Sequence, residues 1–313
     1  RLFVVKKTWS PDIDEIYELV DTSRPEFENL VRDDNVKKYM IEHPFLTKDG
    51  GLIFKSRDSP LVKIDRDSQL VWINQEDQYH HSIEQDHKGN FWIPSRLFPY
   101  QLDKKYVGSE YGNFSDDAIT KVSPDGEIVF QKSVSKIFIE NNMEYLLFQT
   151  GQVFNDDPIH LNDIKPVLTD SQYWKRGDVF LSLRTKSMVI LYRPSTNEII
   201  WKGVGHTFAQ HDVDILDNHR ISIFNNNLKK FHGGDRLDGS NEVVIYDFKI
   251  DTYSKYFNES LIDNEVKTPT QGRSQILDNG DLFIEETDYG RTLYFSKDKS
   301  LQWQHVNRAD DGK

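Results

Sequence analysis

Histidine and arginine side chains recur at matching places in a repeated unit of this 313-residue sequence. Seven residues after the turn glycine of three copies stands an arginine; these are Arg57, Arg96 and Arg184. Eight residues before the turn of two copies stands a histidine; these are His81 and His211. Asn226 takes the arginine position in the copy that holds His211. Crowding cations and imidazoles costs electrostatic repulsion, which an anion bound among them would offset. The pattern therefore predicts an anion-handling site, with a purely structural network as the alternative.

A metal site is the rival use of the same residues. His81, His160 and His211 suit a His₃ site with an open coordination position. Arginines at equivalent positions argue against it, because guanidinium groups disfavour a dication beside them. His80 and His81 cannot both serve as ligands from one strand face, since neighbouring side chains point to opposite sides. We therefore predict no metal. The remaining histidines are expected to be structural: His43, His87, His206, His219, His232 and His305.

Two alternating strand patterns must position these side chains. One is a hairpin with a polar turn that ends on an aromatic residue, as in ITKVSPDGEIVF from Ile119 and VILYRPSTNEIIW from Val189. Further copies start at Leu61 and Leu293, and weaker ones at Val243 and Ile16. The second pattern is an apolar pair, a turn with Gly or Asn, and a strand. It occupies 45–57, 81–96, 211–226 and 274–287, with a fifth copy at 176–184.

Six hairpins spaced by roughly fifty residues predict an all-β, six-bladed β-propeller of four-stranded antiparallel blades. We expect one domain over 1–313. The segment 2–7 would pair beside the C-terminal strand near Trp303 and close the ring. A short helix is expected in an insertion near 135–149, which would form a flap over one face of the ring. Equivalent positions in a propeller lie at the same height and radius, so the site residues should converge at one mouth of the channel. A stack of β-sandwich modules is the alternative.

Composition excludes several classes of protein. The chain has no cysteine, which excludes disulfides, thiolate metal sites and a cysteine nucleophile. Its 39 basic residues form no cluster against 51 acidic ones, which argues against a nucleic-acid partner. No apolar run approaches the ~20 residues of a membrane span. The start at Arg1 shows no targeting pattern, so we expect that such a segment is absent or removed. Walker, dinucleotide, HExxH and GxSxG motifs are absent, and we predict no cofactor.

Several of these motifs together resemble the arylsulfotransferase family, the nucleotide-independent, propeller-fold sulfotransferases. They are His-Leu-Asn at 160–162 after Asp-Pro, GDVFLSLR at 177–184, a hairpin ending in Trp201, Gln-His-Asp at 210–212 and Phe-Asn-Asn at 224–226. The resemblance places the family's nucleophilic histidine on His211, its His-x-Asn pair on His160 and Asn162, and its arginine on Arg184. An earlier family histidine falls on His81, with His80 as the alternative. The family also has an additional N-terminal β-domain, for which we expect no room in this chain, and a cysteine pair, whereas this sequence contains no cysteine.

The resemblance implies transfer of a sulfuryl group from an aryl sulfate to a phenol. The loose transition state of such a transfer spreads negative charge over three oxygens and requires cationic donors and a good nucleophile. An imidazole is largely unprotonated near neutral pH and is a suitable nucleophile. We expect His211 to attack, His160 to act as general acid and base, and Arg184 and Asn162 to hold the sulfuryl oxygens. The remaining substrate-binding residues would be His81, Arg57, Arg96 and Asn226.

Aromatic side chains would bracket the phenolic substrates, namely Tyr173, Trp174, Phe208 and Phe224. The resemblance suggests a periplasmic or secreted protein, while the oligomeric state and the compartment stay open. Two other function classes remain from the residues alone. A propeller lyase or hydrolase acting on an anionic glycan would use His with Tyr or Arg. A non-catalytic propeller would bind a ligand or protein through its loops and would tolerate loss of the histidines.

Overall fold

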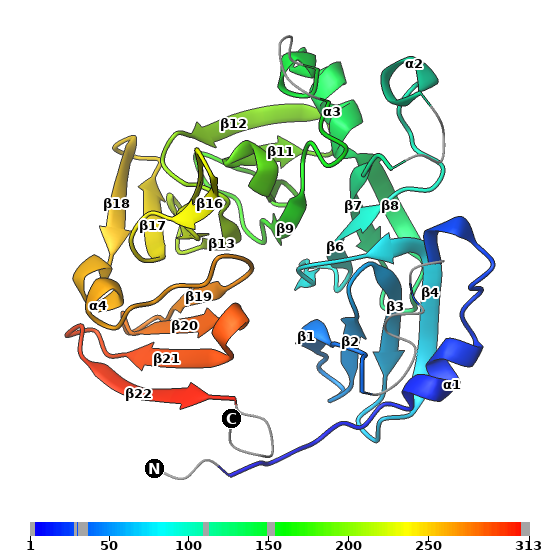
Figure 1. The fold of residues 1–313 in the computed structure, drawn as a ribbon, viewed down its shortest axis with the longest axis horizontal. Helices are drawn as coiled ribbons and strands as arrows, with labels where there is room; N and C mark the ends of the chain where they lie inside the picture. The colour runs from blue at the N-terminus through cyan, green and yellow to red at the C-terminus, as the bar shows by residue number, and fades with distance from the viewer. Residues whose placement is uncertain (1–3, 28–29, 31–36, 109–112, 149–153, 308–313) are drawn as a thin grey trace. The chain divides into compact units, whose positions relative to one another are not determined.

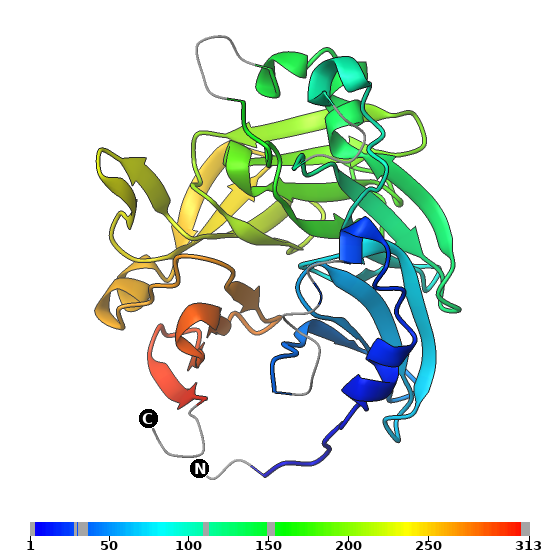
Figure 2. The same cartoon turned by 45° about the vertical axis from the view of Figure 1, so that its right-hand side comes forward.

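The computed structural model describes residues 4–27, 30, 37–108, 113–148 and 154–307. It is an all-β structure of antiparallel sheets with a few short helices (Figures 1 and 2). The chain divides into two compact parts, residues 1–157 and 158–313, and each is described by itself. The single domain over 1–313 stays a prediction. Among the described residues, no helix combines the length and the apolar character needed to cross a membrane.

The first part contains two four-stranded antiparallel meanders. The first consists of β1 (Glu42–Leu46), β2 (Leu52–Lys55), β3 (Ser59–Ile64) and β4 (Leu70–Tyr79). The second consists of β5 (Glu84–Gln85), β6 (Phe91–Arg96), β7 (Asp117–Val122) and β8 (Ile128–Ser133). The end of β4 pairs with the end of β6, which joins the two meanders into one sheet.

A glycine turn fastens these two meanders together. The tight turn between β7 and β8 carries Gly126 at φ +90°, and a Cβ there would lie 2.8 Å from the ring of Trp72 on β4. The Trp72 indole N–H donates to the carbonyl of Pro124 at 3.1 Å, and the Asn74 amide donates to that of Gly126 at 2.7 Å. The Asp-Gly turn thus permits both the left-handed backbone and the close approach of Trp72.

The helices of the first part are short. They are α1 (Ile13–Glu18), α2 (Lys104–Val107), α3 (Val134–Glu140) and the 3₁₀ turn η2 (Glu144–Leu146). The described residues of 135–149 thus contain the predicted helix. Ile137 and Phe138 of α3 are fully buried, and the helix packs on β7 and β8 of its own meander.

The second part contains three further four-stranded antiparallel sheets. The first has β9 (Leu161–Pro166), β10 (Val179–Leu183), β11 (Met188–Arg193) and β12 (Glu198–Val204). The second has β13 (His211–Ile215), β14 (Arg220–Asn225), β17 (Glu242–Asp247) and β18 (Thr252–Tyr256). The third has β19 (Arg273–Ile276), β20 (Leu282–Glu286), β21 (Arg291–Phe295) and β22 (Leu301–Val306).

Shorter elements join these sheets. A hairpin of β15 (Leu228–Phe231) and β16 (Gly234–Leu237) interrupts the second sheet, and α4 (Asn258–Asp263) links the second sheet to the third. The 3₁₀ turns η3 (Arg184–Lys186) and η4 (Thr287–Tyr289) follow β10 and β20. Buried apolar side chains fill the spaces between successive sheets, including Phe180, Leu191, Val213 and Ile223 between the first and the second.

The described residues therefore contain five four-stranded meanders, and neither a sixth nor a closed sheet is found among them. The hairpins predicted from Leu61, Ile119, Val189, Val243 and Leu293 are all present. The one predicted from Ile16 is wrong, because this segment belongs to α1. Asp12 caps that helix by accepting the N–H of Glu15 at 3.0 Å. Within the predicted closing strand 2–7, residues 4–7 form no strand, and residues 2 and 3 lie outside the described residues.

Candidate functional site

Two motifs of the second part are held against each other by side chains of β9. The Asn162 amide group donates to the carbonyl of Gln210 at 2.8 Å, and the Asp163 carboxylate accepts the N–H of Val213 at 2.7 Å. Both side chains are buried. These bonds fix the backbone on either side of His211, so the His-Leu-Asn and Gln-His-Asp motifs form one structural unit.

Asn226 sets the tautomer of His211. Its Oδ1 lies 2.6 Å from Nδ1 of the imidazole, while its Nδ2 donates to the carbonyls of Thr268 at 3.0 Å and Gln271 at 2.7 Å. Because both amide protons are used by carbonyls, Oδ1 must face His211 and accept a proton from it. His211 therefore carries its proton on Nδ1 and its lone pair on Nε2.

The surroundings keep His211 neutral. Burial lowers the pKa of His211 from 6.5 to about 3, although the hydrogen bonds of the imidazole to Oδ1 of Asn226 and to the backbone of Ala209 raise it. The charges of Arg184 and His160 lower this pKa further, which places both residues near His211. The side chain of His211 is 5% exposed. The imidazole is thus an unprotonated base over the whole neutral range.

Arg184 forms no ion pair with any acidic residue in the described part of the chain. It begins the η3 turn, and its backbone N–H donates to the carbonyl of His160 at 3.0 Å. The His160 backbone has φ +50°, a left-handed value that is uncommon for a side-chain-bearing residue. No carboxylate among the described residues pairs with the Arg184 guanidinium. The second part therefore brings together the predicted residues His160, Asn162, Arg184, His211 and Asn226.

Asn162 differs from its expected role in one respect. We expected it to hold sulfuryl oxygens as a donor, but one of its amide protons is used by Gln210. Its Oδ1 is buried and has no hydrogen bond among the described residues. The buried Oδ1 of Asn162 can therefore accept a hydrogen bond, whereas a sulfuryl oxygen would need a donor.

The two predicted arginines of the first part, Arg57 and Arg96, form ion pairs with carboxylates. Arg57 lies 3.6 Å from Glu42, and Arg96 lies 2.8 Å from Asp58 and 3.6 Å from Asp117. These carboxylates neutralise both guanidiniums. The same group includes Lys55, whose ammonium is fully buried 3.9 Å from Glu42, and burial lowers the pKa of Lys55 to about 8.

His80 and His81 also belong to the first part. His80 is buried and His81 is partly exposed, and their Nδ1 atoms lie 2.8 Å apart. His81 has φ +55°.

Other residues of these motifs were not predicted as site residues. Asp163 and Gln210 hold the backbone around His211, and Thr268 and Gln271 orient Asn226. An aspartate follows the histidine closely in both motifs, HLND at 160–163 and QHD at 210–212. This repeated pattern could have identified Asp163 from the sequence. Asp212 faces away, toward the next sheet, where it accepts the N–H of Ser274 at 2.8 Å.

The four aromatic residues expected to bracket a phenol lie in different surroundings. Trp174 and Phe224 are buried in apolar cores, and Tyr173 packs against the core that contains Trp174. Phe208, three residues before His211, is 37% exposed, and the Lys229 ammonium lies 4.5 Å from its ring centre. Over the part of the chain that is described, no three His, Asp or Glu side chains are grouped to hold a metal ion.

Similarity to solved structures is found at low sequence identity. A protein of unknown function from Bacteroides caccae is 13% identical, with a TM-score of 0.54 over 87% of this chain and 84% of that chain. The WD40 domain of Neurospora crassa Pan2 is 13% identical, with a TM-score of 0.46 over 82% and 61%. Virginiamycin B lyase from Staphylococcus aureus is 7% identical, with a TM-score of 0.45 over 87% and 71%. The first of these structures shares the fold of this chain.

A search of curated proteins finds no match. The family model described as arylsulfotransferase (ASST) matches residues 43–308, which is most of the chain and includes every motif around His211. This chain therefore belongs to the arylsulfotransferase family.

Proposed function

We propose that the protein transfers a sulfuryl group from an aryl sulfate to a phenol, without a nucleotide, and that His211 carries the group between the two. Family membership supports sulfuryl transfer. The observation that carries the assignment of His211 is its contact with Asn226, which leaves the lone pair on Nε2 of a neutral imidazole. The guanidinium of Arg184 lies nearby and has no carboxylate partner among the residues that the structure describes.

In the first half-reaction, Nε2 of His211 attacks sulfur and the S–O bond to the aryl group breaks. The new N–S bond leaves a positive charge on the imidazole, which the carbonyl oxygen of Asn226 stabilises through the Nδ1 proton. Arg184 neutralises charge that develops on the sulfuryl oxygens. His160 gives a proton to the departing phenolate.

In the second half-reaction, the phenolic oxygen of the acceptor attacks sulfur and the N–S bond breaks. His160 takes the acceptor proton, and His211 returns to its neutral form. Asn162 supports the site by fixing Gln210, and its unsatisfied Oδ1 suits a hydroxyl donor better than a sulfuryl oxygen. Arg57, Arg96 and His81 remain proposed substrate-binding residues.

The direct test is transfer from 4-nitrophenyl sulfate to phenol in a buffer without nucleotide. We expect nitrophenol release that requires phenol for turnover, together with formation of phenyl sulfate. His211→Gln, which keeps a polar side chain but lacks the imidazole, should abolish transfer, whereas His219→Gln in the β13–β14 turn should not. Equal rates in the two variants, or no transfer in the unmodified protein, would contradict the proposal.

A further inference from the structure

Asp212, the residue after His211, is held in an unusual backbone conformation. Its φ of +47° lies in the left-handed region, which is uncommon for a residue with a side chain. β13 and β14 change register between His211 and Val213, so Asp212 is the extra residue of a β-bulge. A bulge bends its strand, and whatever fixes Asp212 therefore also fixes the backbone of His211.

The carboxylate of Asp212 joins β13 to β19. Its Oδ2 accepts the backbone N–H of Ser274 at 2.8 Å, and its Oδ1 accepts the Nε–H of Arg273 at 3.1 Å. Asp212 is buried, whereas the Arg273 side chain is partly exposed. Charge-assisted hydrogen bonds of this kind are strong where water is excluded, so the carboxylate fixes the start of β19.

The segment just before β19 orients His211 from its other side. The carbonyls of Thr268 and Gln271 accept both amide protons of Asn226. The oxygen of the same amide accepts the Nδ1 proton of His211. Gln271 lies only two residues before Arg273, so one short segment contacts both His211, through Asn226, and its neighbour on β13.

Gly272 makes the connection between these two contacts tight. It has φ +87°, and a Cβ there would lie 2.5 Å from the ring of Phe224 and 2.6 Å from the side chain of Thr268. The backbone is therefore packed closely between side chains at this residue. A displacement of Arg273 cannot be absorbed at Gly272 and must move the carbonyl of Gln271 as well.

From these contacts we infer that Asp212 is a positioning residue for His211. Its carboxylate holds Arg273, and thereby holds the Gln271 carbonyl that orients Asn226. The contacts form a closed circuit that begins and ends at two neighbouring residues of β13. For activity, this role rests on the proposed function of His211, whereas the hydrogen bond of the imidazole can be measured without sulfuryl transfer.

The charge of Asp212 depends on pH in a range where His211 stays neutral. Burial raises the pKa of Asp212 from 3.8 to about 6, although the Arg273 guanidinium lowers it. Two further charged groups act on this carboxylate. Asp214 of β13 raises its pKa and Lys165 of β9 lowers it, and these two side chains pair with each other at 2.7 Å. Above pH 6 Asp212 is ionised and holds Arg273, and below pH 6 it gains a proton and the ion pair is lost.

Nuclear magnetic resonance of the full chain labelled with ¹⁵N-histidine tests the role of Asp212. Long-range ¹H–¹⁵N correlations at pH 8 show which ring nitrogen of His211 is protonated, and His211→Gln identifies these signals by their loss. We expect the proton on Nδ1 in the unmodified protein. Asp212→Asn and Arg273→Gln should each give a mixture of the Nδ1-protonated and Nε2-protonated forms. Arg273→Lys, which keeps the cation, should restore the Nδ1 form.

Asp214→Asn is the matched control, because it breaks an ion pair of the same strand without removing a partner of Arg273. It should retain the Nδ1 form of His211, and unchanged signals of His219 show that each variant is folded. If Asp212→Asn does not fold, the partly exposed Arg273→Gln decides. A pure Nδ1 form in Arg273→Gln, or the same mixture in Asp214→Asn, would overturn the inferred role.

A pH titration of the unmodified protein gives a second test. We expect the Nδ1 proton signal of His211 to change between pH 8 and pH 5 with a midpoint near 6, while the imidazole stays neutral. In Arg273→Gln the midpoint should move to higher pH, because the guanidinium no longer stabilises the carboxylate. No change over this range, or a midpoint that is the same in Arg273→Gln, would overturn the role of Asp212.

Kinetics separate this role from the proposed function. In 4-nitrophenyl sulfate transfer, kcat should fall below pH 6 with the same midpoint and KM should stay constant, because a displaced imidazole attacks less well. At pH 8, Arg273→Gln should lower kcat by up to about 10²-fold, the size of effect that misplacement of a reacting group produces. Absence of transfer together with the expected His211 signals would refute the proposed function and still support the positioning role. Transfer with a kcat that is the same in Arg273→Gln would overturn the role of Asp212 in activity.

Discussion

At the residue scale, a few hydrogen bonds decide what each histidine can do. The Asn226 amide donates both of its protons to the carbonyls of Thr268 and Gln271, so its oxygen faces His211. The alignment of the sequence repeats predicted that His211 and Asn226 both belong to the functional site. It could not predict that Asn226 accepts the Nδ1 proton of His211, because the carbonyls that orient the Asn226 amide come from a loop some forty residues away.

The arginines at equivalent repeat positions differ in the same way. Arg57 and Arg96 are paired with carboxylates, and Arg184 is not paired with any carboxylate that the structure describes. Spacing alone treats the three as alike, because it carries no information on the acidic residues that each sheet places beside them. Of these three arginines, Arg184 is the one for which the described residues supply no carboxylate, so we propose that its charge serves an anionic ligand.

The charge and shape of Arg184 lead to a prediction. Arg184→Lys keeps the cation but loses the planar fork that binds two oxygens of one sulfuryl group. We expect kcat of nitrophenyl sulfate transfer to fall about 10²-fold, comparable to loss of one transition-state donor. Arg176→Lys, an exposed change shortly before β10, is the control and should leave kcat unchanged. Unaltered kcat in Arg184→Lys would show that this side chain is structural.

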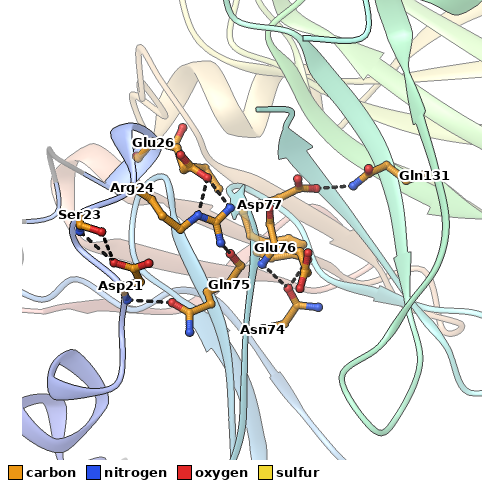
Figure 3. A network of polar contacts seen from close by, with 11 residues as sticks. Asp21, Ser23, Arg24, Glu26, Asn74, Gln75, Glu76, Asp77 and Gln131 are labelled. Atoms are coloured by element: carbon orange, nitrogen blue, oxygen red, sulfur yellow. Dashed lines mark hydrogen bonds and ion pairs between the residues drawn. The ribbon is translucent and has the colours of Figure 1, made fainter. Parts of the chain in front are cut away.

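At the element scale, the segment 13–27 is an N-terminal strap that packs on β4. The side chains of Arg24 and Gln78 bridge the two elements. Arg24 donates to the carbonyls of Gln75 and Glu76 (Figure 3). Gln78 donates to the carbonyl of Glu26. Gln75 accepts the N–H of Asp21 at 2.9 Å. The sequence pattern from Ile16 predicted a hairpin here because apolar residues alternate over a few positions. The Asp12 cap and the burial of Ile13 and Ile16 on β2 and β3 favour the helix instead.

Asp77 on β4 is a buried carboxyl group beside this strap. It accepts from Ser95 at 2.9 Å and from Gln131 (Figure 3). Burial raises the pKa of Asp77 from 3.8 to about 7. The folded state therefore holds a proton that the unfolded chain releases at lower pH. This contribution to stability is complete below pH 3.8 and is lost as the pH rises through 7.

Asp77→Asn tests whether ionisation of this buried carboxyl group destabilises the folded state. The neutral amide removes the charged form, so the stability of the variant relative to the unmodified protein should rise by ~2.5 kcal/mol between pH 5 and pH 8. Urea denaturation at both values measures the change, with exposed Asp67→Asn as the control. A difference between Asp77→Asn and the unmodified protein that does not vary with pH would contradict a raised pKa for Asp77.

At the scale of the whole molecule, the alternation of two strand patterns predicted an all-β fold of repeated four-stranded sheets, and five of the hairpins are present where expected. The count of six is not confirmed, because the described residues contain five four-stranded sheets. The sixth sheet was expected from the segment at Ile16, which belongs to α1, and from a strand over 2–7, of which the described residues 4–7 form no strand. Local patterns identify sheets well, but ring closure depends on pairing between distant ends of the chain, which no local pattern contains.

The complete reaction cycle gives the last prediction. If His211 carries the sulfuryl group, the donor product must leave before the acceptor reacts, so steady-state kinetics should be ping-pong with parallel double-reciprocal lines. Without phenol, nitrophenyl sulfate should release one equivalent of nitrophenol per chain in a burst. Mass analysis of peptides kept at alkaline pH should locate the sulfuryl group on His211, since an N-sulfated imidazole is labile in acid and survives in base.

Two variants make this test specific. His211→Gln should show no burst. His160→Ala should keep the burst but slow it, most strongly for phenols that are poor leaving groups, because those depend most on a proton from His160. Intersecting lines, or a burst that persists in His211→Gln, would exclude the covalent mechanism. Direct transfer would then need donor and acceptor bound together, and the neutral, correctly oriented imidazole of His211 would serve as a base instead of a nucleophile.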